Sequence, residues 1–322
     1  MTATFYTSAD TSAPTLNDTQ GALAAVLLAI LVNGYGSQSA AGWTTAYTGS
    51  TGQYAFKQGG GNSNYLNIDD SAATGISTYA RVSGYTSMTA FGAGAGQFPN
   101  NVQQSGGLYW PRFQYTSATS PSRWACIATN KTFYFWNEGD GTNNGSKNVQ
   151  QLFFFGDMNT YGTNDTSCTV IGGATGASDT NSWTYTSVSV ITATLIIYAA
   201  ANSFGTSGSS PQGFHSDYWL NGASNVMGNG GVVYTNPEDT GLYVKPIWLT
   251  DPVGVNNILR GLMPGIWNCC HAASNFANTS ITTSQFSANG SDQTSGKTFT
   301  ILKLGNGGST GTVTFETSNT WS

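Results

Sequence analysis

Charged residues are scarce in this chain of 322 amino acids. Only 8% are charged, with 10 Lys and Arg against 15 Asp and Glu, and the formal net charge is −5. An average soluble protein carries about 25% charged residues. Nucleic-acid binding needs a basic surface, so the composition argues against a nucleic-acid partner. The shortage of Glu and Lys also argues against a long-helix or coiled-coil protein.

Cysteine and histidine are also rare, with four Cys and two His. The four cysteines are Cys126, Cys168, Cys269 and Cys270. They are too few for the disulfide framework of a small secreted domain, so we expect synthesis in a reducing cytoplasm. The run 269–271 places two Cys beside His271, but neighbours in sequence rarely converge on one metal ion. The sequence therefore predicts no metal and no other cofactor.

Long apolar runs are also missing. The longest, residues 22–32, has 11 residues. As a helix it would be about 16 Å long, which is about half of the hydrocarbon core of a bilayer. We therefore expect no membrane span. Residues 1–6 show neither a basic region nor an apolar core, which predicts that there is no secretory signal.

The same run predicts the one helix of the chain, over residues 14–33. Thr15 or Asn17 is suited to cap it, Asp18 suits its first turn, and residues 33–34 suit its end. The helix is apolar all round, so it should be buried on every side, either in the core of the chain or in a subunit interface. Its candidate structural or assembly residues are Leu23, Val26, Leu27 and Ile30.

Strand patterns dominate from residue 42 onward. Gly accounts for 41 residues and aromatics for 13%, and short alternating segments are separated by Gly, Ser and Asn. Strands are expected at 53–57, 65–69, 78–82, 124–128, 132–136, 151–156, 168–172, 241–249, 257–261, 298–302 and 312–316. The continuous apolar run 151–156 indicates a strand buried on both faces. Residues 190–201 fit a strand or a helix, and their β-branched side chains favour a strand.

These patterns predict a mainly β fold. Its sheets should be antiparallel, arranged as a sandwich or a barrel-like structure, with long Gly/Ser/Asn loops and one buried N-terminal helix. Residues 124–136 read as a hairpin that turns at 129–131. The chain is expected to form a single β-rich unit over residues 1–322, with the Gly-rich loop 92–107 as a weak candidate boundary.

No segment carries a recognisable catalytic motif. Residues 140–145 imitate the start of a calcium loop, but Gln151 stands where the bidentate Glu should be, so we interpret them as a turn. The pairs 69–70 and 238–239 are adjacent carboxylates. Neighbours on a strand point to opposite faces, so neither pair suits acid–base catalysis. We therefore expect that the chain is not an enzyme.

Several aromatic side chains are suited to stacking on sugars. In β proteins such residues more often fill the core or pair across strands, and both interpretations stay open. The residues concerned are Tyr109, Trp110, Phe133, Tyr134, Phe135, Trp136, Trp219 and Trp248.

Short motifs spread along the chain resemble a family of tailed-bacteriophage virion proteins. One is Tyr-Thr-Ser-Ala-Asp-Thr-Ser-Ala-Pro-Thr-Leu at 6–16, and another is Leu-Arg-Gly-Leu-Met-Pro-Gly-Ile-Trp at 259–267. The remaining motifs lie at 31–36, 41–43, 105–110, 153–157, 239–243 and 315–321. Their order covers nearly the whole chain, and none of them is catalytic.

The resemblance implies a structural component of the virion, made in the host cytoplasm. We expect it in multiple copies at the neck or collar, at the tail, or as decoration of the head exterior. Its partners would be copies of itself and other virion proteins. The alternative is a receptor- or glycan-binding module of a tail fibre or baseplate, whose further partner would be a host surface glycan. A glycan depolymerase is the third alternative, but the carboxylates are scattered.

Three further sites are candidates for structural or assembly roles. Arg260 precedes an expected turn at 261–265, and we expect its guanidinium to hold backbone carbonyls or a carboxylate in that turn. Trp267 closes the same motif. Cys269 and Cys270 are candidates for a disulfide between subunits that forms after the particle is released, and the alternative is that all four thiols stay reduced and packed.

Overall fold

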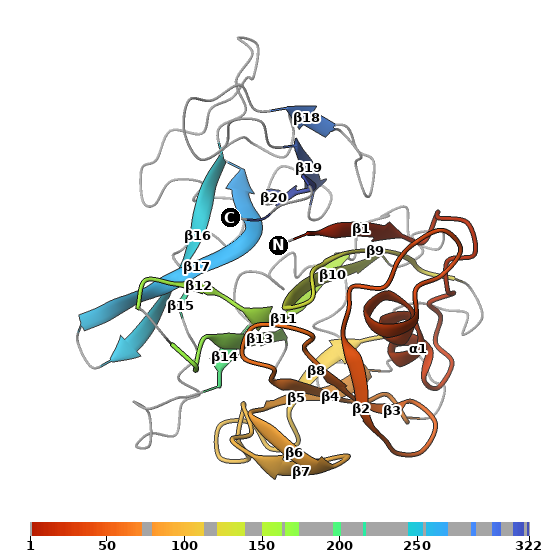
Figure 1. Ribbon diagram of the computed structural model, residues 1–322, viewed down its shortest axis with the longest axis horizontal. Coiled ribbons are helices and arrows are strands. Elements are labelled where there is room, and N and C mark those ends of the chain that lie inside the picture. The colour runs from red at the N-terminus through yellow and green to blue at the C-terminus, as the bar shows by residue number, and fades with distance from the viewer. Residues whose placement is uncertain are drawn as a thin grey trace.

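In the part of the chain that it describes, the computed structural model has three large antiparallel sheets, a separate two-stranded hairpin and one short α-helix (Figure 1). It describes residues 2–72, 79–112, 121–138, 150–162, 165–173, 196–200, 215–216, 244–253, 256–269, 285–287, 298–303, 312–318 and 321. Within these residues, no helix has the length and apolar character needed to cross a bilayer.

A six-stranded sheet forms the middle layer. Its strands follow the order β1-β9-β10-β11-β13-β14, and every neighbouring pair is antiparallel. The bounds are β1 Thr4–Thr7, β9 Arg123–Ala128, β10 Thr132–Glu138, β11 Gln150–Asp157, β13 Thr169–Gly173 and β14 Ile196–Ala199. The hairpin expected at 124–136 is therefore present as β9 and β10.

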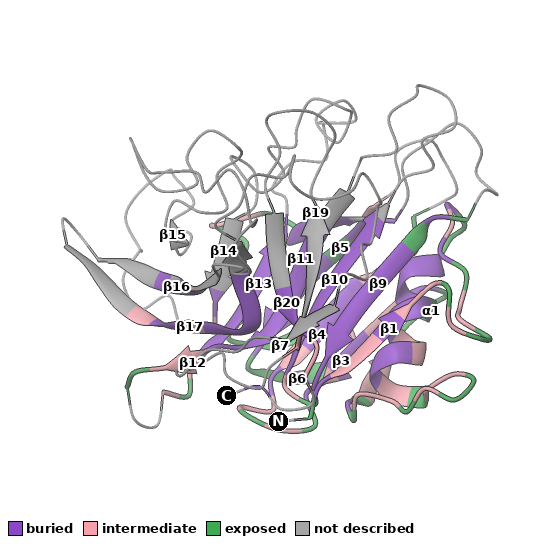
Figure 2. Cartoon of the chain, turned by 90° about the horizontal axis from the view of Figure 1, so that it is seen from above, coloured by how far each residue is buried: buried purple, intermediate pink, exposed green. Residues whose placement is uncertain are grey.

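Both faces of this sheet are buried (Figure 2). Along β11, Phe153 and Phe155 belong to one apolar cluster and Phe154 belongs to another. Side chains alternate between the faces of a strand, so an apolar residue at every position means that both faces are covered. This confirms the prediction that residues 151–156 form a strand buried on both faces.

A five-stranded sheet and the helix cover the first face. The sheet has the order β2-β3-β4-β5-β8 and packs its inner residues, such as Phe56 and Ile68, into the first cluster. A separate hairpin, β6–β7, follows β5. The bounds are β2 Thr44–Thr48, β3 Gln53–Lys57, β4 Tyr65–Asp69, β5 Tyr79–Tyr85, β6 Ser87–Ala90, β7 Ala93–Ala95 and β8 Leu108–Pro111.

The third sheet covers the second face. Its order is β15-β16-β17-β20-β19-β18, with β12 paired to β17. Met263, Ile266 and Phe315 pack with Phe154 in the second cluster. The bounds are β12 Asn159–Thr160, β15 His215–Ser216, β16 Val244–Val253, β17 Asn256–Cys269, β18 Gln285–Ser287, β19 Thr298–Lys303 and β20 Thr312–Glu316.

The predicted mainly β fold is therefore confirmed. The sheets stack as in a sandwich, and the described strands form no closed barrel. Part of the expected loop 92–107 is strand β7, and its role as a domain boundary stays a prediction. Of the run 190–201, only 196–200 lies in the described part, where 196–199 form β14.

The helix is shorter than predicted. It comprises α1, Ala22–Leu28, and the π-helical turn η1, Ala29–Asn33, so the expected start at residue 14 is wrong. No side chain of the preceding segment caps it. The N-cap is Gly21, which has φ +81°, and its Cα lies against Gly52 so closely that a side chain would disturb the contact. Gly at this place lets two backbone segments meet.

The turn expected at 261–265 does not reverse the chain. Leu262 pairs with Trp248 and Trp267 with Pro246, so residues 263–266 bulge opposite a single residue of β16. Gly265 has φ +71°, and the Trp321 ring occupies the space where its side chain would be. The Gly therefore serves a bulge inside one long strand, β17.

Candidate functional site

The predicted helix residues belong to the core of the chain. Leu23, Val26, Leu27 and Ile30 are all completely buried in the first cluster. This answers the question left open by the sequence: these four side chains pack within the chain and do not face another subunit. The helix is not buried on every side, however, because Ala25 is exposed and other residues of that face are half-buried.

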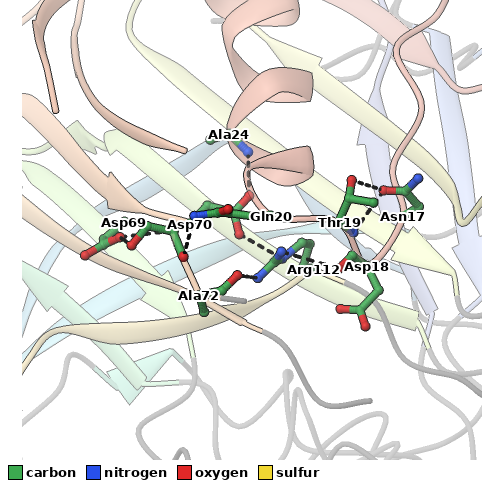
Figure 3. Close-up of polar contacts among 10 residues, drawn as sticks. Asn17, Asp18, Thr19, Gln20, Ala24, Asp69, Asp70, Ala72 and Arg112 are labelled. Carbon is green, nitrogen blue, oxygen red and sulfur yellow. Dashed lines mark hydrogen bonds and ion pairs between the residues drawn. The ribbon is translucent and has the colours of Figure 1, made fainter. Parts of the chain in front are cut away.

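A buried ion pair lies where the helix begins (Figure 3). Arg112 Nε is 2.9 Å from Asp70 Oδ1, and both side chains are completely buried. The other Asp70 oxygen accepts a 3.1 Å hydrogen bond from the Ala24 N–H, and the Asp70 carbonyl accepts one from Gly21. Asp70 thus caps α1 from a distant part of the chain and satisfies donors that a helix start leaves free.

Arg112 also ties two other segments to this site. Its Nη2 donates to the Ala72 carbonyl at 2.9 Å and its Nη1 to the Asp18 carbonyl at 3.5 Å. Asp18 itself is buried and lies before the helix, not in its first turn. One guanidinium therefore connects the segment before the helix, the end of β4 and the end of β8.

Burial controls the titration of the Asp70 carboxyl. It raises the pKa of the Asp70 carboxyl from its ordinary value of 3.8 to about 7, although Arg112 and the hydrogen bonds from the helix start lower it. A carboxyl with such a pKa is suited to proton transfer near neutral pH. Because its side chain has no exposed surface, no substrate reaches it, and we assign it a structural role.

The raised pKa predicts a pH-dependent stability. Between about pH 4 and about pH 7 the folded chain keeps a proton on Asp70 that the unfolded chain releases, so stability should fall as the pH rises through this window. Asp70→Asn should remove the part of the pH dependence of the free energy of unfolding that this proton causes. The test compares free energies of unfolding at about pH 5 and about pH 8. The control is Asp10→Asn, because Asp10 is not among the groups that shift the pKa of Asp70. An equal dependence of the free energy of unfolding on pH in all three proteins would contradict the prediction.

A second buried carboxylate joins the five-stranded sheet to the middle sheet. Asp157 Oδ1 accepts hydrogen bonds from Thr169 Oγ1 at 2.5 Å and Gln58 Nε2 at 3.0 Å, and its Oδ2 accepts one from the Asn62 N–H at 2.9 Å. Asn64 Nδ2 donates to Thr169 Oγ1 at 2.7 Å. The donors to the Asp157 carboxylate are thus neutral groups of the β3–β4 loop and of β13, an arrangement that fixes the loop 58–64 against the middle sheet.

A third carboxylate holds the N-terminal segment. Asp10 accepts from the Thr7 N–H and hydroxyl at 2.9 Å each, from Tyr35 Oη at 2.9 Å and from Gln38 Nε2 at 3.0 Å. Burial and these contacts with Asp10 raise the pKa of Tyr35. The segment after β1 is therefore fastened to the turn that follows the helix.

Arg260 forms a two-pronged ion pair. Its Nε lies 2.6 Å from Asp165 Oδ2 and its Nη2 lies 2.8 Å from Asp165 Oδ1. The sequence predicts that this guanidinium holds backbone carbonyls or a carboxylate within residues 261–265. Its partner is a carboxylate, but one outside this segment. The pair joins β17 to the segment that precedes β13, and Arg260 lowers the pKa of the Asp165 carboxyl mainly through its hydrogen bonds.

Arg260→Ala should lower the melting temperature slightly. The two side chains are 18% and 15% exposed, so the pair should stabilise the fold by about 1 kcal/mol or less. Because the pKa of Asp165 is lowered, this contribution is present above the ordinary carboxyl pKa and is lost as the pH falls through the lowered one. Thermal unfolding near neutral pH is the measurement. An unchanged melting temperature would contradict a structural role.

Trp267 is buried on β17 and serves the third sheet. Its Nε1 donates to the buried Glu316 carboxylate at 3.3 Å, which also accepts from Ser318 Oγ at 2.9 Å. Cys269 ends β17, but its side chain and the whole of Cys270 lie outside the described residues, so the disulfide hypothesis stays a prediction. Cys126 and Cys168 are free and buried.

The other candidates of the sequence divide into two groups. The aromatics Trp110 and 133–136 are buried, so they are not available to stack on a sugar. Residues 140–145, 238–239 and Trp219 lie outside the described part, as does the side chain of Trp248. Among the described side chains, no three His, Cys, Asp or Glu come together as metal ligands.

The motifs behind the family resemblance consist largely of packing residues. Tyr6 Oη donates to the Ser39 carbonyl at 2.7 Å, which links the motif 6–16 to the chain after the helix. Two indole N–H groups donate to backbone carbonyls far along the chain, Trp43 to Thr129 and Trp110 to Gly172. The Trp321 indole donates to the nearby Glu316 carbonyl. Residues 239–243 are outside the described part. The described motifs thus specify the fold.

Comparisons with known proteins leave the family open. The chain matches no protein-family model, and a search of curated proteins found no relative. The resemblance to phage virion proteins therefore stays a prediction from the motifs.

Proposed function

We propose that the chain is a non-catalytic structural component of a tailed-phage virion. It assembles in multiple copies, with itself and with other virion proteins, at the neck or collar, the tail or the head exterior. Two of the described carboxylate sites, around Asp70 and Asp157, are buried, and the described motifs are used for packing. Both features suit a protein that works by holding its shape in an assembly.

The observation that carries the proposal is the outer face of the helix. Ala25 is exposed, and Leu28, Ala29 and Val32 are half-buried, at the spacing of one helix face. No charged residue occurs between Asp18 and Lys57. An apolar strip without charge is suited to burial against another subunit.

Mass photometry of the recombinant chain and cryo-EM of purified particles test the proposal. We expect symmetric multiples in solution or in the particle. Ala25→Asp should weaken assembly, because it places a charge in the strip at an exposed position. Thr89→Asp, an exposed position on β6, is the control. A stable monomer that is absent from purified virions would overturn the proposal.

A further inference from the structure

The outer face of the five-stranded sheet carries a row of four polar and aromatic residues. Phe56, Ile68 and Val82 point into the first cluster, so the alternate positions of the same strands point away from it. In the strand register, Gln53 lies opposite Asp69, Asp69 opposite Arg81, and Arg81 opposite Tyr109. We call Gln53, Asp69, Arg81 and Tyr109 the polar row. Directly opposite side chains on neighbouring strands lie about 5 Å apart, so the row is continuous.

Contacts within the row hold its groups in place. The Arg81 guanidinium lies over the Tyr109 ring, 5.1 Å from its centroid. Tyr79 meets the same ring edge-on at 4.6 Å. Asp69 Oδ1 accepts from the Ser71 N–H at 3.1 Å and from its hydroxyl at 2.5 Å. The charged groups are therefore positioned before any partner arrives.

Within the described residues, the hairpin β6–β7 covers another part of this face and leaves Arg81 exposed. The hairpin β6–β7 packs Met88 against Ala55 and Tyr85. Gly92 N–H donates to Asn67 Oδ1 at 3.0 Å, and Tyr47 Oη donates to the Met88 carbonyl at 2.9 Å. Figure 1 shows the hairpin beside β4 and β5. The hairpin thus covers the neighbouring positions Ala55 and Asn67 on one side of the polar row.

The exposure of the row matches this arrangement. Arg81 is exposed, and Gln53, Asp69 and Tyr79 are half-buried. Tyr109 is only 5% exposed, so it supports Arg81 from below. Among the described contacts, the Arg81 guanidinium makes no hydrogen bond or ion pair. Its N–H groups are therefore available as donors to a partner.

We propose that the polar row binds a neutral oligosaccharide. The Gln53 amide is already bonded to Ser50 and Ser71, so the ligand-binding groups are the Asp69 carboxylate and the Arg81 guanidinium. These two lie opposite each other on neighbouring strands and offer an acceptor beside donors, which suits neighbouring hydroxyl groups. Asp69 and Arg81 carry opposite charges side by side, so together they favour a neutral ligand over an anionic one. The half-buried Tyr79 ring provides an apolar surface for the C–H face of a sugar. This inference does not depend on the virion assignment.

A glycan array that carries neutral and acidic oligosaccharides tests the proposal with the full chain. We expect binding to neutral glycans. Titration calorimetry with the best neutral glycan should show Arg81→Ala and Asp69→Asn each weakening affinity by about tenfold or more, the effect of losing a charged hydrogen bond. Lys57→Ala is the matched control, because Lys57 lies over the Tyr65 ring at 5.3 Å outside the row. It should leave affinity unchanged.

Three results would overturn the proposal. The first is no binding to any glycan on the array. The second is binding to acidic glycans alone, which would mean that Asp69 does not take part. The third is an equal loss of affinity in Lys57→Ala and Arg81→Ala. Melting temperatures of all variants should stay near that of the parent chain, because Arg81 is exposed and asparagine at position 69 keeps an oxygen for the Ser71 donors.

Discussion

Replacing Arg112 with methionine should lower the free energy of unfolding by about 3–5 kcal/mol, the usual cost of leaving one partner of a buried ion pair alone. Methionine keeps much of the volume but has no N–H group. Asp70 would then lack its cation, and the Asp18 and Ala72 carbonyls would lose their donor. Chemical denaturation at about pH 9, where Asp70 with its pKa of about 7 is ionised in the parent chain, is the measurement.

The double variant Asp70→Asn, Arg112→Met separates charge from packing. Asparagine retains an oxygen for the Ala24 N–H and carries no charge. If the unpaired charge causes the loss, the double variant should be more stable than Arg112→Met alone. A double variant as unstable as the sum of its single changes would show that Arg112 and Asp70 act independently, contrary to this account.

The sequence predicted strands well where the pattern was local. The expected segments 53–57 and 65–69 match β3 and β4 residue for residue. In these strands the alternation of side chains reports directly which face is buried. The apolar run 151–156 was informative for the same reason, since only a strand between two layers has apolar residues at every position.

The sequence misled where distant residues decide local structure. The helix start depends on Asp70, 46 positions beyond Ala24, and no neighbouring residue signals it. Residues 261–265 have the composition of a turn, but the Trp321 ring beside Gly265 and the pairing with β16 make them part of a bulged strand. In both cases the partner is close in space and far along the chain.

The candidate sites follow the same rule. Arg260 was singled out from sequence as a bracing residue, but its partner Asp165 is 95 positions away. The polar row needs the strand order and the register of four strands before its members come together. The residue type of Tyr109 suits sugar stacking, but the structure places its ring beneath Arg81. No local spacing connects these two residues.

Asp157→Ala should destabilise the chain by several kcal/mol, because each of its buried donors left without an acceptor costs about 1–3 kcal/mol. The change removes the acceptor of Thr169, Gln58 and the Asn62 N–H, and with it the connection between two sheets. The matched control is Asp10→Ala, which also removes a carboxylate with several donors.

Burial should decide the difference between these two variants. Asp157 is 7% exposed, whereas the donors around Asp10 are only partly buried. Water can replace a lost acceptor at the surface, but it reaches a closed site poorly. Asp10→Ala should therefore lower the free energy of unfolding less than Asp157→Ala. Denaturant unfolding of both variants measures the two costs. Equal losses of free energy of unfolding would show that the hydrogen bonds of Asp157 stabilise the chain no more than those of Asp10. Packing around the loop 58–64 would then be what holds the two sheets together.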